Sequence, residues 1–323
     1  EKPCGGGLTH KVLARYPFLR ENGRPKKIVR RAVLEAANGS RVEVLLRDPI
    51  YIYSRYELNS LVLERAAEAG AELVRDRITA VERTGQGWRL RGCTRAYAAD
   101  FLVLAAGART PFRDFSGRLQ PADVGTTLGY LIPGTREHLE VQFQKEFEGY
   151  LWVFPRVDHL SVGIYGKPGL EAAARLKQRL HGYIEERGLR LAGATFYSHL
   201  LPSLSARTLR TQRLAGDGWA AVGDAAGLVD AITGEGLYYA LRSADLFSAC
   251  YLAGRPAEYS RRLRADCGFE LEIAAHLSCR FYHGKFLGAP ITTRMVQLAR
   301  HSPRFRSLMQ DLFAGSQGYL GLK

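Results

Sequence analysis

The residues best suited to chemistry directly follow a short apolar run. Trp219–Val222 is followed at once by Gly223 and Asp224, a pattern that predicts a buried strand ending at a turn. Asp224 would then stand at the carboxyl end of a strand, the edge at which open α/β sheets bind ligands. An isolated Gly-Asp pair is usually only a turn, so the pattern gains meaning from the residues after it.

A glycine-rich turn and a long helix come next. The sequence TGEG at 233–236 precedes Leu237–Leu252, an apolar-rich run long enough for a helix of about four turns. Glycines at the head of a helix let a ligand approach the backbone N–H groups, and the helix dipole favours negative charge there. The arrangement suits a group that carries or develops an anion, such as the N1/C2=O edge of a reduced flavin.

The elements that must position this turn include a second buried strand. The run 100–107, DFLVLAAG, is continuously apolar, which predicts a parallel strand buried on both faces and closed by Gly107. Before it, Glu72–Val74, Ile78–Arg83 and Trp88–Arg91 are expected to be short strands.

The N-terminal third contains a hairpin and a capped helix. Ile28–Leu34 and Arg41–Leu46 flank an Asn-Gly turn, the typical sign of a β-hairpin. Ser54, with a glutamate three residues later, predicts the start of a helix over Arg55–Ala69. Thr9 is expected to precede another helix, which Pro17 interrupts.

The middle of the chain changes to a period of two. Apolar residues at 139, 141 and 143 alternate with polar ones, which predicts an antiparallel sheet with one covered face. In GYLWVFP at 149–155, Tyr150, Trp152 and Phe154 share one face of a strand. Such a stripe is either sheet core or the wall of an apolar trench, which would suit a long hydrocarbon chain.

Three segments together resemble the geranylgeranyl reductase family of FAD-dependent oxidoreductases, which have a hydroxylase-like flavoprotein fold. They are PCGGG at 3–7, YxWxFP at 150–155 and GDAAG with TGEG at 223–236. The resemblance implies FAD as cofactor, with Asp224 near its ribityl-pyrophosphate part. It also implies that Tyr150, Trp152 and Phe154 line the substrate cavity. The cofactor-binding positions it implies are Gly5, Gly6, Arg55, Gly107, Gly223, Asp224, Gly234, Glu235 and Gly236.

The chemistry implied by the resemblance is saturation of C=C bonds in a polyprenyl group on a lipid, quinone or chlorophyll precursor. Reduced FAD would deliver a hydride, and Cys4 or Tyr150 would be the proton donor. NAD(P)H or ferredoxin would supply the electrons. Two alternatives remain open: a flavin-dependent monooxygenase or halogenase of the same fold, and a non-catalytic lipid-binding protein.

Composition limits the partners. At 323 residues, 46% hydrophobic and 24% charged, the chain is typical of a folded globular protein. A net charge of +14 favours attraction to anionic surfaces, and the absence of a nucleic-acid motif leaves lipid as the preferred partner. Arg294–Phe313 is expected to be an amphipathic helix, either packed on the core or resting on an anionic membrane as a peripheral contact.

The five cysteines have neither CxxC pairing nor metal-ligand spacing, so we expect reduced thiols, no metal site and a cytoplasmic location. No strand-GxGxxG-helix fingerprint is present, so we expect that the N-terminal βαβ unit is missing and that FAD binds poorly.

The expected fold class is α/β: a Rossmann-like parallel sheet for FAD, interleaved with an antiparallel-sheet substrate domain and followed by a helical C-terminal region. The expected boundaries are 1–27, 51–118 and 205–254 for the FAD-binding domain, 28–50 and 119–204 for the substrate domain, and 255–323 for the C-terminal region.

Overall fold

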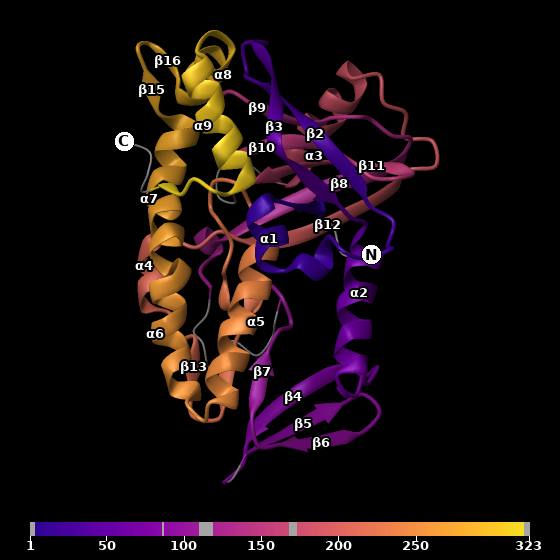
Figure 1. Cartoon of the computed structure of the whole chain (residues 1–323), viewed down its shortest axis with the longest axis vertical. Helices are drawn as coiled ribbons and strands as arrows, with labels where there is room; N and C mark the ends of the chain where they lie inside the picture. Colours follow the sequence, from indigo (N-terminus) through magenta and orange to yellow (C-terminus); the bar gives the residue numbers. More distant parts are fainter. Residues whose placement is uncertain (1–3, 86, 110–118, 168–172, 320–323) are drawn as a thin grey trace.

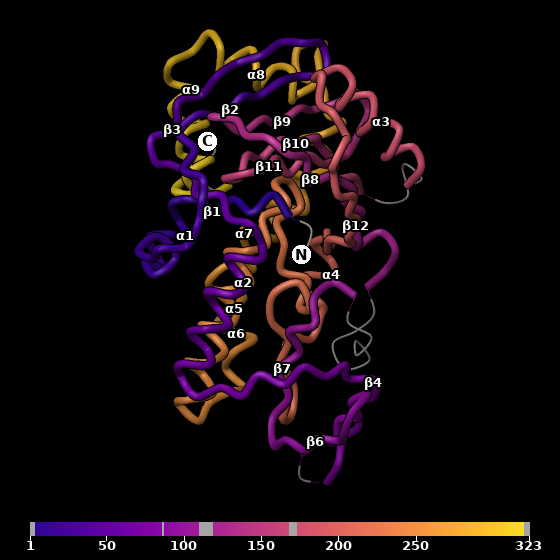
Figure 2. Tube along the Cα trace, turned by 90° about the vertical axis from the view of Figure 1, so that its right-hand side faces the viewer, coloured from indigo at the N-terminus to yellow at the C-terminus, as the bar shows by residue number. Residues whose placement is uncertain are grey.

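A large sheet occupies the upper half of the molecule, and two small sheets occupy the lower half (Figure 1). The computed structural model describes residues 4–85, 87–109, 119–167 and 173–319. Seen from the side, α2 and β7 lie between the large sheet and the small sheet of β4, β5 and β6 at the bottom (Figure 2). The mixed α/β architecture confirms the expected fold class. Within these ranges, no helix is both long enough and apolar enough to cross a bilayer.

The large sheet has eight strands in the order β1-β3-β2-β9-β10-β11-β8-β12. The predicted hairpin supplies strands β2 and β3 of this sheet, and β2 also pairs with β9 in parallel. The strand bounds are β1 Gly7–Leu8, β2 Lys27–Glu35, β3 Arg41–Ile52, β8 Val124–Pro133, β9 Leu139–Phe143, β10 Gly149–Pro155, β11 His159–Gly166 and β12 Thr195–Pro202.

One face of this sheet packs on helix α3, Ala173–Glu186. Leu151 and Val153 of β10 are fully buried there, against Leu176 and Leu180 of the helix. Tyr150, Trp152 and Phe154 alternate with them and so occupy the other face. The predicted division of β10 into two faces is confirmed.

Strand β9 does not have the one-sided exposure that its alternating sequence predicts. The polar residues Glu140 and Gln142 are 4% and 8% exposed. Glu140 lies 3.5 Å from Arg187, and Gln142 donates to Glu35 at 3.0 Å. Because these polar partners come from distant parts of the chain, both faces of β9 are covered.

Two helices pack on the hairpin side of the sheet. They are α8, Ile291–His301, and α9, Pro303–Ala314, so the single helix expected over Arg294–Phe313 is wrong. Ser302 caps α9 by accepting from the N–H of Phe305, and the proline after it prevents a continuous helix. Buried residues of both helices contact Val42 and Val44 of β3.

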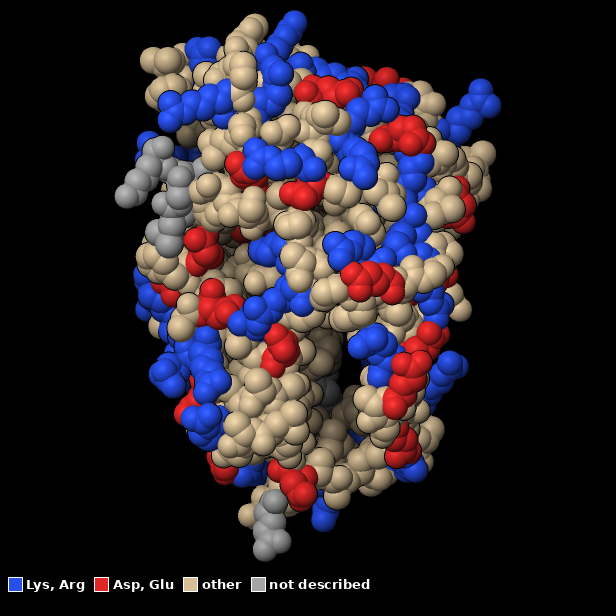
Figure 3. Space-filling model, viewed as in Figure 1, with Lys and Arg blue, Asp and Glu red and all other residues tan. Residues whose placement is uncertain are grey.

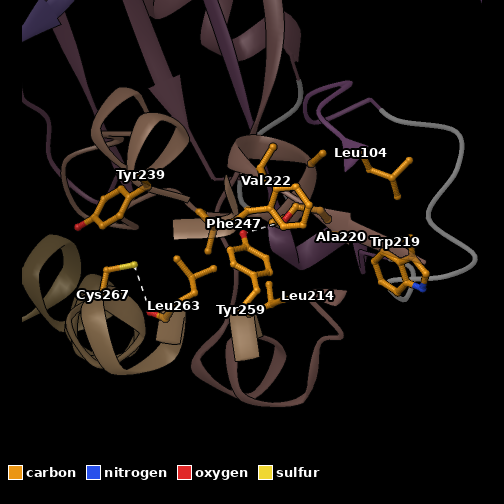
Figure 4. Close-up of a cluster of buried hydrophobic side chains, with 14 of the residues drawn as sticks. Leu104, Leu214, Trp219, Ala220, Val222, Tyr239, Phe247, Tyr259, Leu263 and Cys267 are labelled. Carbon is orange, nitrogen blue, oxygen red and sulfur yellow. Dashed lines mark hydrogen bonds between the residues drawn. The ribbon is translucent and has the colours of Figure 1, made fainter. Parts of the chain in front are cut away.

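The lower half contains the short parallel pair of β7, Leu102–Leu104, and β14, Trp219–Ala221, with β13, Ala215–Gly216, beyond β14. Helix α5, Leu237–Leu252, begins and ends where the sequence predicts. Figure 4 shows Phe247 and Tyr259 packed beside Ala220, and the Tyr259 hydroxyl donates to the carbonyl of Ala221 at 2.9 Å.

Two predictions in this half are wrong. Strand β7 is the edge of its sheet among the described residues, and its Val103 is 40% exposed, so it is not buried on both faces. Glu72–Val74 is not a strand, and Leu73 is 60% exposed. In both cases, the described part of the chain covers the apolar side chain only in part.

The remaining elements connect these parts. Ser54 accepts from the N–H of Glu57 and caps α2 as predicted, and Thr9 precedes α1. Their bounds are α1 His10–Arg15, η1 Pro17–Leu19, α2 Arg55–Glu68, β4 Ile78–Arg83, β5 Trp88–Gly92, β6 Ala96–Ala99, η2 Pro121–Asp123, α4 Ala206–Thr211, η3 Gly223–Ala226, η4 Pro256–Glu258, α6 Tyr259–Leu263, the π-turn η5 Arg264–Gly268, α7 Phe269–His283, β15 Lys285–Phe286 and β16 Ala289–Pro290.

Candidate active site

The N-terminal glycine loop presses against strand β10. A Cβ atom on Gly5 would lie 2.1 Å from the Phe154 ring, and one on Gly6 would lie 2.1 Å from the carbonyl oxygen of Tyr53. Gly6 also has φ of +80°, a region that favours glycine. The PCGGG and YxWxFP segments are therefore in direct contact, and glycine is the residue that this contact tolerates.

A buried arginine fixes the start of this loop. The carbonyl of Cys4 accepts from Arg156 Nη2 at 2.8 Å and from Ser161 Oγ at 3.1 Å. Arg156 is 2% exposed, and Ser161 is also bonded to the Tyr197 hydroxyl at 3.0 Å. These supporting residues could not be predicted from the sequence, because only their position in space connects them to Cys4.

The turn that carries TGEG meets the same face of β10, at Tyr150 near the start of the strand. The Tyr150 hydroxyl donates to the carbonyl of Thr233, and a Cβ atom on Gly234 would lie 3.0 Å from that hydroxyl. Tyr282 of α7 donates to the carbonyl of Ile232 at 2.6 Å. Two tyrosines from different elements thus hold one turn.

Asp230 is a buried carboxylate in this turn that the sequence analysis missed. Its Oδ1 accepts from the N–H groups of Ile232 and Thr233, both at 2.8 Å, and from the Tyr319 hydroxyl at 3.0 Å. Burial raises the pKa of Asp230, although these hydrogen bonds oppose the shift. The aspartate followed by a threonine three residues later was a local signal for this turn.

Glu235 connects the turn to the N-terminal helix. Its carboxylate accepts from Lys11 Nζ at 3.1 Å and from Thr9 Oγ1 at 3.3 Å. Burial raises the pKa of Glu235, and the charge of Lys11 opposes that rise. The Glu235 side chain, at a predicted cofactor-binding position, therefore connects the TGEG turn to the N-terminal segment that carries Thr9 and Lys11.

The other predicted cofactor positions lie at the carboxyl ends of the parallel strands. Val222 N–H donates to the carbonyl of Leu104 at 3.0 Å, so Gly107 and Gly223 follow paired strand ends. Gly107 has φ of +76°, and a Cβ atom there would meet no described atom within 4 Å. Asp224 Oδ1 would lie 3.2 Å from a Cβ on Gly236, the N-cap of α5.

These features fit an anionic dinucleotide. Gly236 stands at the N-cap of α5 and has no side chain, so a ligand can approach the first N–H groups of the helix closely. A hollow opens between α5 and α2 in the lower half of Figure 3. Arg55, the first residue of α2, is partly exposed and donates to Asn59 at 3.1 Å.

The aromatic stripe is not uniformly accessible. Tyr150 and Phe154 are partly exposed, whereas Trp152 is 5% exposed and donates to Ser161 Oγ at 3.4 Å. Burial raises the pKa of Tyr150 well above its ordinary value. Tyr150 contacts the turn, and Phe154 contacts the glycine loop. Trp152 lies deeper, against the neighbouring strand β11. Their predicted role in lining the substrate cavity stays a prediction.

The chain is 30% identical, over 68% of its length, to digeranylgeranylglycerophospholipid reductase 2 of Methanothermobacter thermautotrophicus; the aligned part is 59% of that relative. It is 26% identical to menaquinone reductase of Mycobacterium tuberculosis, over 95% of this chain and 82% of that one. By sequence and fold, this chain is related to the geranylgeranyl reductase family.

Among solved structures, a geranylgeranyl bacteriochlorophyll reductase-like protein from Thermoplasma acidophilum has a TM-score of 0.73 at 18% identity, over 96% of this chain and 89% of that one. This likeness shows that the two share a fold. No family model matches the chain.

Proposed function

We propose that the protein is an FAD-dependent reductase that saturates C=C bonds of a polyprenyl group carried by a lipid or quinone. The observation that supports this most directly is the meeting of three segments: the glycine loop at Cys4, the aromatic strand at Tyr150 and the turn at Gly234. The reductases named among the relatives support the same reaction.

The residues that would hold FAD are those at the strand ends and at the head of α5. The backbone N–H groups at Gly236 and the first turn of α5 would face negative charge, and Gly107 leaves room for close approach of the dinucleotide. Asp224, at the carboxyl edge of β14, would accept from hydroxyl groups of the ribityl chain. When bound and reduced, the flavin supplies the hydride.

A side chain of this chain, or a water that it holds, would supply the proton. The Tyr150 hydroxyl is protonated at neutral pH and stands at the turn that bears Gly234, so it is the first candidate donor, although burial raises its pKa and makes it a weaker acid. Cys4, whose carbonyl is fixed by Arg156, is the second candidate donor. Proton transfer must assist this reaction because an isolated alkene is a poor hydride acceptor.

The apolar side chains around the site favour a hydrocarbon substrate. Phe154 lies against the glycine loop and Tyr150 against the turn, so a polyprenyl chain between them would gain about 0.8 kcal/mol for each buried CH2. We propose NAD(P)H or ferredoxin as the electron donor, and peripheral contact with an anionic membrane that supplies the lipid.

The deciding experiment combines a visible spectrum with mass spectrometry. The purified protein is mixed with FAD, the bound flavin is reduced chemically, and a geranylgeranyl lipid is added. We expect a flavin spectrum and a mass gain of about two per reduced double bond. Incorporation of oxygen or halogen would instead assign a monooxygenase or halogenase. No bound flavin would favour the lipid-binding alternative.

A pair of tyrosine variants tests the proposed proton donor. Tyr150→Phe should slow product formation by on the order of 100-fold or more while flavin binding persists. Tyr130→Phe is the matched control, because its hydroxyl bonds His181 at 2.8 Å on the opposite face of the sheet. Equal rates in the two variants would remove Tyr150 from the mechanism.

A further inference from the structure

A small hairpin projects from the upper left of the molecule in Figure 1. It consists of β15 and β16, and the turn between them carries two large apolar side chains. Phe286 is 54% exposed and Leu287 is 75% exposed. Exposing two adjacent bulky apolar residues to water is unfavourable, so packing within the chain does not explain this tip.

The backbone of the tip is held in an uncommon conformation. Leu287 has φ of +48°, a left-handed value that costs free energy for a bulky residue. Arg294 of α8 donates to the carbonyls of both Phe286 and Leu287. One arginine thus fixes the two residues in the orientation that exposes them, and such local strain is typical of positions that bind something.

The sequence around the hairpin is strongly cationic. From residue 273 to residue 310 the chain has no Asp or Glu. The same stretch contains six Lys and Arg residues: Arg280, Lys285, Arg294, Arg300, Arg304 and Arg306. In the upper left of Figure 3, over the hairpin and the adjacent helix, the visible surface is blue and tan.

Helix α8 extends this surface. It packs against both strands of the hairpin, and its Leu298 is 44% exposed. Arg300, two residues further along, is also exposed. The exposed surface therefore combines apolar side chains with cations, the composition that suits the boundary between anionic headgroups and acyl chains.

We infer that the hairpin at 285–290 is a membrane-docking element, which inserts Phe286 and Leu287 into the surface of an anionic bilayer while Lys285 contacts the headgroups. A purely electrostatic partner would not require two adjacent exposed apolar side chains at the tip, one of which, Leu287, is aliphatic. The biological purpose rests on the proposed function, since a polyprenyl lipid resides in a bilayer. The binding itself does not depend on catalysis.

Vesicle flotation tests this inference. The protein is mixed with vesicles of equal parts phosphatidylcholine and phosphatidylglycerol, and in parallel with vesicles of phosphatidylcholine alone. We expect binding to the mixed vesicles, weakened by added salt because headgroup attraction is screened. The double variant Phe286→Ser, Leu287→Asn should lose binding by on the order of 10-fold or more, since its apolar insertion is lost. Asparagine is chosen because it tolerates the left-handed backbone.

Two matched controls locate the surface. Leu252→Ser removes a residue that is 84% exposed at the end of α5 and should leave binding unchanged. Lys285→Glu should weaken binding, whereas Arg89→Glu on β5, at the opposite end of the long axis, should not. Equal losses in the hairpin variants and in these controls would overturn the inference.

A direct readout separates this proposal from the failure of the enzymatic one. Phe286→Trp should add blue-shifted emission on the mixed vesicles, quenched by brominated lipids, over the background of the native protein. Normal flavin binding in the double variant, with loss of flotation, would show that docking is separate from the cofactor site. Retained flotation of the double variant, or binding to heparin but to neither vesicle, would refute the docking role.

Discussion

Strands β10 and β7 are both apolar, yet they are buried to very different degrees. Leu151 and Val153 of β10 are fully buried beneath α3, whereas Val103 of β7 is 40% exposed. Helix α2 also leaves Leu63 46% exposed. The upper sheet is covered on both faces over its central strands, and the lower sheet has an open edge next to the hollow of Figure 3.

This difference indicates that the upper sheet provides rigidity, whereas the lower sheet leaves room for ligand access. Elements with many buried apolar contacts open only at a high free-energy cost, whereas those with exposed backbone and few contacts open more easily. The proposed substrate wall at Tyr150 therefore stands on the rigid sheet. The proposed cofactor positions at Gly107 and Asp224 stand on the sheet that a ligand would stabilise most.

The largest expected effect on stability comes from truncating a side chain in the upper sheet, and a truncation in the lower sheet is its comparison. Leu151→Ala should lower the free energy of unfolding by about 2 to 5 kcal/mol, because it leaves a cavity in a fully packed core. Val103→Ala should change it by about 0.5 kcal/mol or less, since the side chain is already exposed. Urea unfolding followed by circular dichroism measures both; similar losses would contradict the contrast between the sheets.

The packing of the N-terminal glycine loop can be tested at Gly6. Gly6→Ala should cost about 1 to 3 kcal/mol for its backbone strain alone, plus the clash with the Tyr53 carbonyl. Gly39→Ala is the control, because Gly39 also has φ of +80° but its Cβ would meet no described atom within 4 Å. Thermal unfolding of both variants isolates the contact; equal shifts would mean that the loop is not tightly packed.

A smaller effect on stability is expected where helix α7 supports the turn at 230–236. Tyr282→Phe removes the hydrogen bond to the Ile232 carbonyl and should cost about 1 kcal/mol. Tyr251→Phe, at a side chain that is 45% exposed, is the control and should cost little. Hydrogen exchange at 230–236 is the second measurement, and unchanged protection in the Tyr282 variant would show that the turn does not depend on α7.

The smallest effect is a change in pH dependence. Because the folded-state pKa of Asp230 is raised by burial, its contribution to stability is complete below the ordinary value of 3.8 and is lost as pH rises through the folded-state value. Asp230→Asn should remove this loss, so its stability relative to the native protein should rise with pH above 3.8. Urea unfolding across this range checks the sign against Asp100→Asn, an exposed aspartate; parallel curves would contradict the burial argument.

Local signals in the sequence predicted the local elements well. The bounds of α5 and the Ser54 cap of α2 depend on residues within one or two turns of each other. The paired polar residues on β9 could not be foreseen, because Glu140 meets Arg187 only after α3 has folded over the sheet. The break between α8 and α9 was readable at Pro303, but the amphipathic pattern continues across it and obscured the boundary.

The candidate site was predictable only in part. The resemblance identified Tyr150 and Gly234, and the structure brings these two together. Asp230 and Lys11 were missed, because the local sequence around each gives no sign of its distant partner. Their importance comes from a tertiary contact, to Tyr319 in one case and to Glu235 in the other.

The contacts that assemble the site also determine when it can form. Arg156 and Cys4 are 152 positions apart, and Thr9 and Glu235 are 226 apart. Contacts of such sequence separation form slowly, because a long loop must close before they are made. A nascent chain can pair β2 with β3, and later β8 with β11, while it is still being synthesised. Thr9 and Lys11 must then wait until Glu235 has left the ribosome before they can bind its carboxylate.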